Sequence, residues 1–107
     1  MMNTKFCKVT AIFSSLELEK VEGALKAIGV SGLTVSKVRG FGEYRNYYAE
    51  DTMADWVRAE IFEEAGRAEK IVKTIARTVH KGLDSDGFVA VLPVEDLLHI
   101  RDFKDVP

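Results

Sequence analysis

The chain has little cysteine, proline or histidine, and it has no long apolar run. Its 107 residues include a single cysteine, Cys7, so no disulfide can form within the chain. This suits a reducing compartment, and we expect a cytoplasmic protein. No apolar segment approaches the ~20 residues of a membrane-spanning helix, and the start lacks a signal-peptide pattern. Alternation with apolar neighbours places Cys7 in the core or at an interface.

Groups that could carry catalysis or bind a metal are scarce. The two histidines, His80 and His99, fall on different predicted elements, which argues against a closed metal site. His80 falls near the end of a predicted helix, where a cation complements the helix dipole. The acidic pairs 63–64 and 95–96 are adjacent residues, and such pairs seldom converge on one substrate bond. We therefore expect no catalytic residues, no metal site and no enzyme.

The charge balance is close to neutral, with a formal net charge of -2 and a pI near 5.7. A strongly basic surface is what nucleic-acid binding requires, so nucleic acid is not an expected partner. An anionic ligand would have to be held by local groups, because the overall field does not attract it.

Apolar periodicity predicts both strands and helices. Ser14 and Glu17 match a capping box at the start of the first helix, and Gly29 falls where its C-terminal cap is expected. The second helix is predicted at 66–81, before Gly82. Alternation predicts four strands, at residues 6–13, 33–38, 56–63 and 88–92.

The order β-α-β-β-α-β predicts an α+β fold of the ferredoxin-like kind, with a long loop over residues 43–54 after the second strand. Composition does not shift along the chain, so we expect one domain over residues 1–107. Residues 94–102 fit either a helical turn or a short extra strand. Helices on one sheet face leave the other open, and apolar residues there favour an oligomer. The candidates for this open face are Phe6, Ile12, Leu33, Trp56, Phe62, Phe88 and Leu92.

Two glycine-containing segments could bring backbone amides close to a ligand. Gly40-Phe41-Gly42 follows a strand but precedes no helical pattern, so the dinucleotide-binding fingerprint does not apply. These glycines either allow close approach to a ligand or only bend the chain. The turn at 84–87 either orients amides toward phosphate oxygens or is only a turn.

Several segments together resemble the PII signal-transduction family, and they span nearly the whole chain. The resemblance is carried by VTAI at 9–12, AIGV at 27–30, SGLTV at 31–35, VRGFG at 38–42, GLDSDGFVAVLPVED at 82–96 and HIR at 99–101. It implies a homotrimer that binds ATP or ADP in clefts between subunits. The loop at 43–54 would be the T-loop, which reports the ligand to a protein target, here an unknown transporter or enzyme.

The resemblance also implies which positions bind nucleotide. The adenine and ribose would lie against Ile12, Gly32, Leu33 and Thr34. The T-loop base would contribute Gly40, Phe41 and Gly42, with Glu60 and Phe62 alongside. The phosphates would face Asp86, Gly87 and Arg101, with Phe88 directly after them.

This chain departs from the family pattern at the phosphate end. Phe88 and His99 stand where the family usually has lysine or arginine, and the T-loop is several residues shorter. Because each charge-assisted hydrogen bond is worth about 1.5–3 kcal/mol, we predict that ADP or AMP is favoured over ATP. The departures resemble the carboxysome-associated type, which senses bicarbonate with an adenine nucleotide. Arg39, Arg45 and Arg58 are the candidates for holding such a small anion.

Two alternatives remain open at this stage. The first is a standard nitrogen-regulatory PII protein that responds to ATP, ADP and 2-oxoglutarate. The second is a ferredoxin-like trimer that binds metal or no nucleotide at all and acts as an interaction module. Nucleotide titrations separate the leading prediction from the second alternative.

Overall fold

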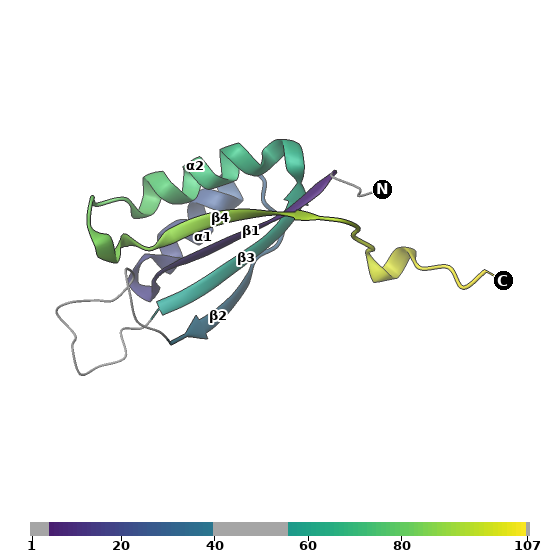
Figure 1. Cartoon of the computed structure of the whole chain (residues 1–107), viewed down its shortest axis with the longest axis horizontal. Helices are drawn as coiled ribbons and strands as arrows, with labels where there is room; N and C mark the ends of the chain where they lie inside the picture. The colour runs from purple at the N-terminus through teal and green to yellow at the C-terminus, as the bar shows by residue number, and fades with distance from the viewer. Residues whose placement is uncertain (1–4, 40–55, 107) are drawn as a thin grey trace.

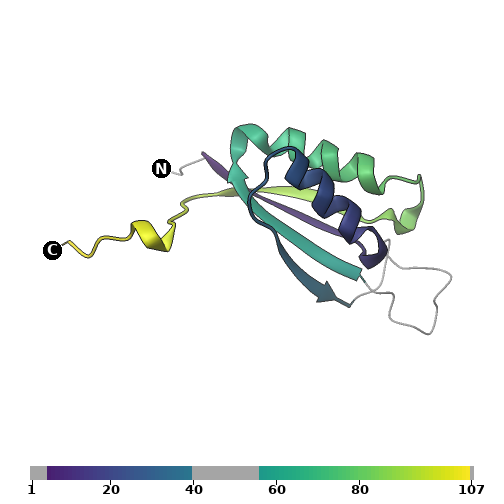
Figure 2. The same ribbon diagram turned by 180° about the vertical axis from the view of Figure 1, so that it is seen from behind.

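The computed structural model describes residues 5–39 and 56–106. Four strands form one antiparallel sheet in the order β2-β3-β1-β4, and two helices cover one of its faces (Figures 1 and 2). The strands are β1 (Phe6–Ser14), β2 (Thr34–Val38), β3 (Trp56–Glu64) and β4 (Phe88–Val94), and the helices are α1 (Leu18–Ala27) and α2 (Ala68–Val79). The predicted β-α-β-β-α-β order is confirmed.

The core lies between the helices and the sheet. Along β1 every second residue is buried, because successive strand side chains point to opposite faces. Cys7 is one of these buried residues, as expected, and burial raises the pKa of its thiol. Helix α2 contributes Ile71, Ile75 and Val79 at helical spacing, as predicted. Each fully buried aliphatic or aromatic side chain contributes roughly 1.5–3 kcal/mol relative to exposure.

The end of α1 shows how a local sequence sets a boundary. Gly29 has φ +87°, a left-handed conformation that glycine adopts without cost. Its amide donates to the Lys26 carbonyl at 3.0 Å, and the Val30 amide donates to the Leu25 carbonyl at 3.0 Å. This is the Schellman arrangement, and Val30 and Leu25 both lie in the core, as that motif favours. The predicted glycine cap is confirmed.

The start of α1 differs from the prediction. The Ser14 hydroxyl accepts a hydrogen bond from the Leu16 amide at 3.3 Å and begins a 3-10 turn, Ser15–Glu17. In a capping box the Glu17 carboxylate would accept a hydrogen bond from the Ser14 backbone amide, but it lies 2.6 Å from the Lys81 ammonium instead. The ion pair between Glu17 and Lys81 therefore replaces the second hydrogen bond of the predicted capping box.

Two other boundaries were settled by the tertiary structure. Strand β4 continues through Pro93 to Val94, which the edge position of β4 allows because proline has no amide to donate to a neighbouring strand. After Val94 the chain leaves the sheet and forms a 3-10 turn at Ile100–Asp102, so the helical-turn interpretation of 94–102 is correct. This tail projects away from the body (Figure 1).

The open face of the sheet is partly apolar. Phe62, Phe88 and Leu92 are exposed there, at 54%, 46% and 42%, while Phe6 and Ile12 are half-buried. Trp56 also lies on this face, opposite Ser14 in the register, and its side chain is only 4% exposed in the single chain. One predicted member of this face is wrong, because Leu33 packs against the helix-side core.

Candidate nucleotide-binding site

The loop between α2 and β4 is organised around one carboxylate. Asp86 Oδ2 accepts hydrogen bonds from the amides of Lys81 at 2.8 Å, Gly82 at 2.9 Å and Leu83 at 3.3 Å. These bonds, the one from Lys81 first, lower the pKa of Asp86. Asp86 therefore shapes the loop, and its facing a phosphate group stays a prediction.

Gly87 allows this loop to lie directly on β1. Its φ is +103°, and a β-carbon built on it would lie 1.9 Å from the Ile12 carbonyl oxygen. No side chain fits at this position, because a β-carbon cannot lie so close to a backbone oxygen. Strand β4 begins immediately afterwards, with Phe88 opposite Ile12 in the register.

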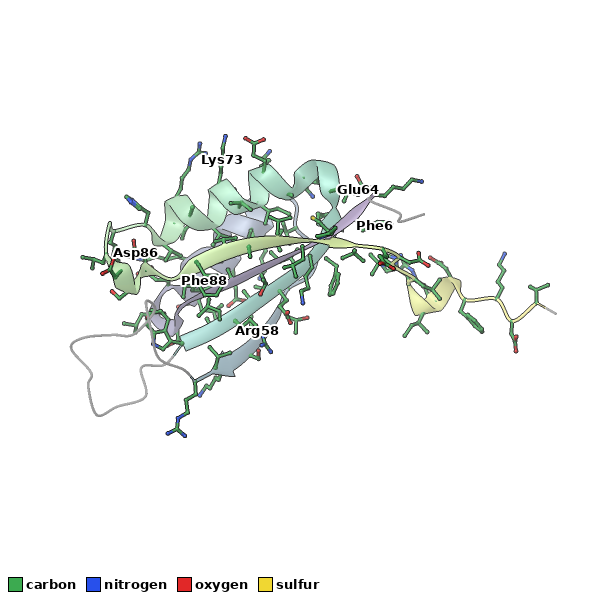
Figure 3. All side chains as sticks on the ribbon, viewed as in Figure 1. Phe6, Arg58, Glu64, Lys73, Asp86 and Phe88 are labelled. Carbon is green, nitrogen blue, oxygen red and sulfur yellow. The ribbon has the colours of Figure 1, made fainter. Side chains whose placement is uncertain are left out.

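A cavity of about 300 Å³ opens beside this loop. Three predicted site residues, Ile12, Asp86 and Phe88, share its wall with His80 and with apolar side chains of α2. Figure 3 shows Asp86 and Phe88 at this end of the sheet. With the adjacent Gly87, Asp86 and Phe88 form a first group at the β4 edge, and Ile12 lies beside Phe88 on the neighbouring strand β1.

A second group lies at the opposite edge, around β2. Thr34 pairs with Glu60 in the β2–β3 register, Gly32 and Leu33 precede Thr34, and Phe62 follows Glu60 on the same face. Glu60 is engaged by two cations, with Lys8 Nζ at 2.9 Å and Arg58 Nε at 3.9 Å. The hydrogen bond from Lys8 is the main cause of the lowered pKa of Glu60.

The two groups do not meet within one chain. Strands β2 and β4 are separated by β3 and β1, and three strand spacings amount to roughly 14 Å. Arg101 is further away still. Its turn, Ile100–Asp102, lies on the tail, at the end of the molecule opposite Asp86 (Figures 1 and 3). Asp86–Phe88, Gly32–Thr34 and Arg101 therefore lie at three separate places in the single chain.

Several predicted residues cannot be placed. Gly40, Phe41, Gly42 and Arg45, with the T-loop at 43–54, lie outside the described residues. Arg39 is exposed and comes directly after β2, and Arg58 is an exposed side chain on β3 (Figure 3).

Sequence reasoning missed the ion pair that joins this loop to α1. The Glu17 side chain is only 7% exposed, and its Oε2 lies 3.8 Å from Lys20 in addition to the Lys81 contact. The hydrogen bond with Lys81 is the main reason that the pKa of Glu17 is lowered and that of Lys81 is raised. The partners are 64 positions apart, so no local pattern could have revealed them.

Within residues 5–39 and 56–106, no three His, Cys, Asp or Glu side chains gather as a metal ion would require. In the same part of the chain, no helix is both long and apolar enough to cross a membrane.

These features define a ferredoxin-like α+β fold, and comparison with known proteins gives the family. The family model described as nitrogen regulatory protein P-II matches residues 6–104. The P-II homolog of Arabidopsis thaliana is 35% identical over 107 residues, and P-II of Azospirillum brasilense is 31% identical over 101. A crystal structure of Arabidopsis thaliana PII bound to citrate has a TM-score of 0.77 at 36% identity, covering 94% of this chain and 87% of that one. The chain belongs to the P-II family of regulatory proteins.

Coverage differs among the relatives. The two matches cover 92% and 88% of this chain. The chain spans about half the length of its plant relatives, 55% of the Arabidopsis protein and 50% of the homolog from Oryza sativa subsp. japonica. It spans 90% of the Azospirillum brasilense protein.

Proposed function

We propose that this protein is a homotrimeric PII-like sensor, built as a single domain, that binds adenine nucleotide between subunits and signals to a protein target through its T-loop. The binding favours ADP or AMP over ATP, and the ligand acts without turnover. Bicarbonate is the proposed second effector.

The observation that carries this proposal is the division of the candidate site between two sheet edges. A ring in which the β4 edge of one subunit meets the β2 edge of the next would repeat the same contact at every boundary. Each boundary would then join Asp86–Phe88 of one chain to Gly32–Thr34 of another. The exposed apolar side chains Phe62 and Leu92 support burial of the open face in such an assembly.

The nucleotide preference follows from the side chains around the cavity. Among the described residues that line it, the basic group is the imidazole of His80, and no lysine or arginine contributes. Phe88, the first residue of β4, places an aromatic ring rather than a cation after Gly87. A triphosphate carries more charge than a diphosphate, so it loses more from each missing charge-assisted hydrogen bond.

Calorimetry with AMP, ADP and ATP tests the nucleotide claim, and analytical ultracentrifugation tests the trimer. We expect one site per subunit, with ATP bound no more tightly than ADP. ATP binding at least tenfold tighter than ADP would refute the preference, whereas no heat with any of the three would favour a nucleotide-free interaction module.

Bicarbonate is proposed because Arg58 is an exposed cation on the open face, beside the β2 group. Its Nε lies 3.9 Å from the single carboxylate Glu60, which Lys8 also engages, so this cluster carries a net positive charge. Arg39 and Arg45 are further candidates from the sequence. We expect the affinity for ADP to rise when bicarbonate is added at constant pH and ionic strength, and an unchanged affinity would count against this effector.

The second candidate function is standard nitrogen regulation, which the names of the relatives favour. Proteins from Azospirillum brasilense and Escherichia coli are called nitrogen regulatory protein P-II. Adding 2-oxoglutarate in place of bicarbonate distinguishes the two, since only a nitrogen sensor should bind nucleotide more tightly in its presence.

A further inference from the structure

The loop from His80 to Gly87 is held at three points, and one of them lies outside the proposed nucleotide site. The Asp86 carboxylate accepts hydrogen bonds from the amides at the start of the loop, and Gly87 packs the end of the loop against the Ile12 backbone. The third point is Lys81, whose ammonium donates to Glu17 Oε1 at 2.6 Å. Glu17 belongs to the turn before α1, so this contact ties the loop to a different part of the fold.

Lys81 is engaged at both ends, which makes it a connector. Its backbone amide donates to Asp86 Oδ2, while its side chain reaches Glu17. Gly82, the next residue, has φ +82°, and a β-carbon there would contact nothing within 4 Å. Residues 81–84 at the start of the loop are exposed, so this part has little packing to hold it, and the ion pair supplies a restraint there.

The burial of the Glu17 side chain strengthens this restraint. A carboxylate whose side chain is 7% exposed needs a cationic partner, because an unpaired buried charge is costly. Lys20 is 3.8 Å away and largely exposed, so Lys81 is the closer partner. If the loop moved Lys81 away from Glu17, the buried carboxylate would lose its closer partner. The cost of that loss holds the loop in place.

We propose that Glu17 is a positioning residue for nucleotide binding: its ion pair with Lys81 holds the Lys81–Gly87 loop in the shape that receives the phosphates. This inference rests on the proposed function. The rival is that Lys81 contacts the phosphates directly, in place of the cation missing at Phe88. The two hypotheses predict different effects of removing the Glu17 carboxylate. If Lys81 contacts the phosphates directly, the loss of Glu17 frees its ammonium for them. If Glu17 positions the loop, its loss loosens the loop.

The first experiment measures ADP affinity by calorimetry for Glu17→Gln, Lys81→Gln and the double variant. Positioning predicts that each single change weakens ADP binding roughly tenfold and that the double variant is no weaker than either. Glu69→Gln is the matched control, because it removes a 2.9 Å ion pair with Lys73 on the exposed side of α2. If Glu17→Gln binds ADP as tightly as the wild type while Lys81→Gln loses affinity, the proposal is wrong.

The second experiment is independent of nucleotide. Hydrogen exchange of the ligand-free protein should be faster at the amides of residues 81–83 in Glu17→Gln, with β1 amides unchanged. Unchanged exchange at these three amides overturns the inference. If the wild type binds no adenine nucleotide, the proposed function fails, and the hold of Glu17 on the loop is then decided by exchange alone.

Discussion

Replacing Gly87 with alanine should destabilise the protein far more than the same change at other glycines. Gly87 has φ +103° and ψ -157°, a region that essentially only glycine adopts and that costs an alanine about 1–3 kcal/mol. The new β-carbon would also lie 1.9 Å from the Ile12 carbonyl oxygen and 3.2 Å from the Phe13 α-carbon. Both are backbone atoms, so the start of β4 would have to withdraw by roughly 1 Å, at a further cost of about 1–3 kcal/mol.

The expected total is roughly 2–6 kcal/mol, or a fall in melting temperature of more than about 8 °C for a domain of this size. Two other glycines separate the contributions. Gly82 has φ +82° with open space around it, so Gly82→Ala should lower the free energy of unfolding only by the conformational part, about 1–2 kcal/mol. Gly23→Ala lies inside α1 and contacts nothing, so it should stabilise by roughly 0.5–1 kcal/mol.

Urea and thermal unfolding, followed by circular dichroism at one protein concentration, give the comparison. The concentration has to be constant because oligomerisation adds to apparent stability. If Gly87→Ala costs no more than Gly82→Ala, the close approach of the loop to β1 does not constrain the protein and the reasoning fails.

Three further predictions concern the open face, the phosphate end and acid. Phe62→Glu should shift the proposed trimer to smaller species in analytical ultracentrifugation, because it places a charge on an exposed apolar position; an unchanged sedimentation coefficient would contradict this. Phe88→Lys should strengthen ATP binding relative to ADP by roughly tenfold in calorimetry, since it adds one charge-assisted hydrogen bond; an unchanged ratio would count against the assignment of the loop. The folded-state pKa values of Glu17, Glu60 and Asp86 are lowered, so their contribution to stability is complete above about pH 4.5 and is lost as the pH falls through the folded values; denaturation midpoints that stay constant from pH 6 to 3 would refute it.

Most of the fold could be predicted because its signals are local. The alternation along β1, the helical spacing in α2 and the glycine after α1 each depend on residues within one or two turns of chain. Errors arose where a distant segment decided the outcome. Pro93 continues a strand because β4 lies at the sheet edge, and Leu33 packs against the helix-side core instead of the open face.

The candidate site could be predicted only in part. The family resemblance identified Ile12, Asp86 and Phe88, which line one cavity in the structure. It did not reveal that Asp86 is occupied by loop amides. Nor did it reveal that Asp86–Phe88 and Gly32–Thr34 lie at opposite sheet edges, because that placement is a property of strand order and not of any one segment.

The order of elements, their boundaries to within a few residues and the class of protein could be read from the amino-acid sequence alone. These follow from periodicity, from glycines at helix ends and from motifs that are contiguous in the chain. The contact that the Glu17 carboxylate makes could not be read from the sequence, because it depends on the tertiary structure. Its neighbours fit a capping box, but its carboxylate is buried against Lys81, 64 positions away. A buried charge pairs with the cation that the fold brings nearest, and distance along the chain does not predict distance in space.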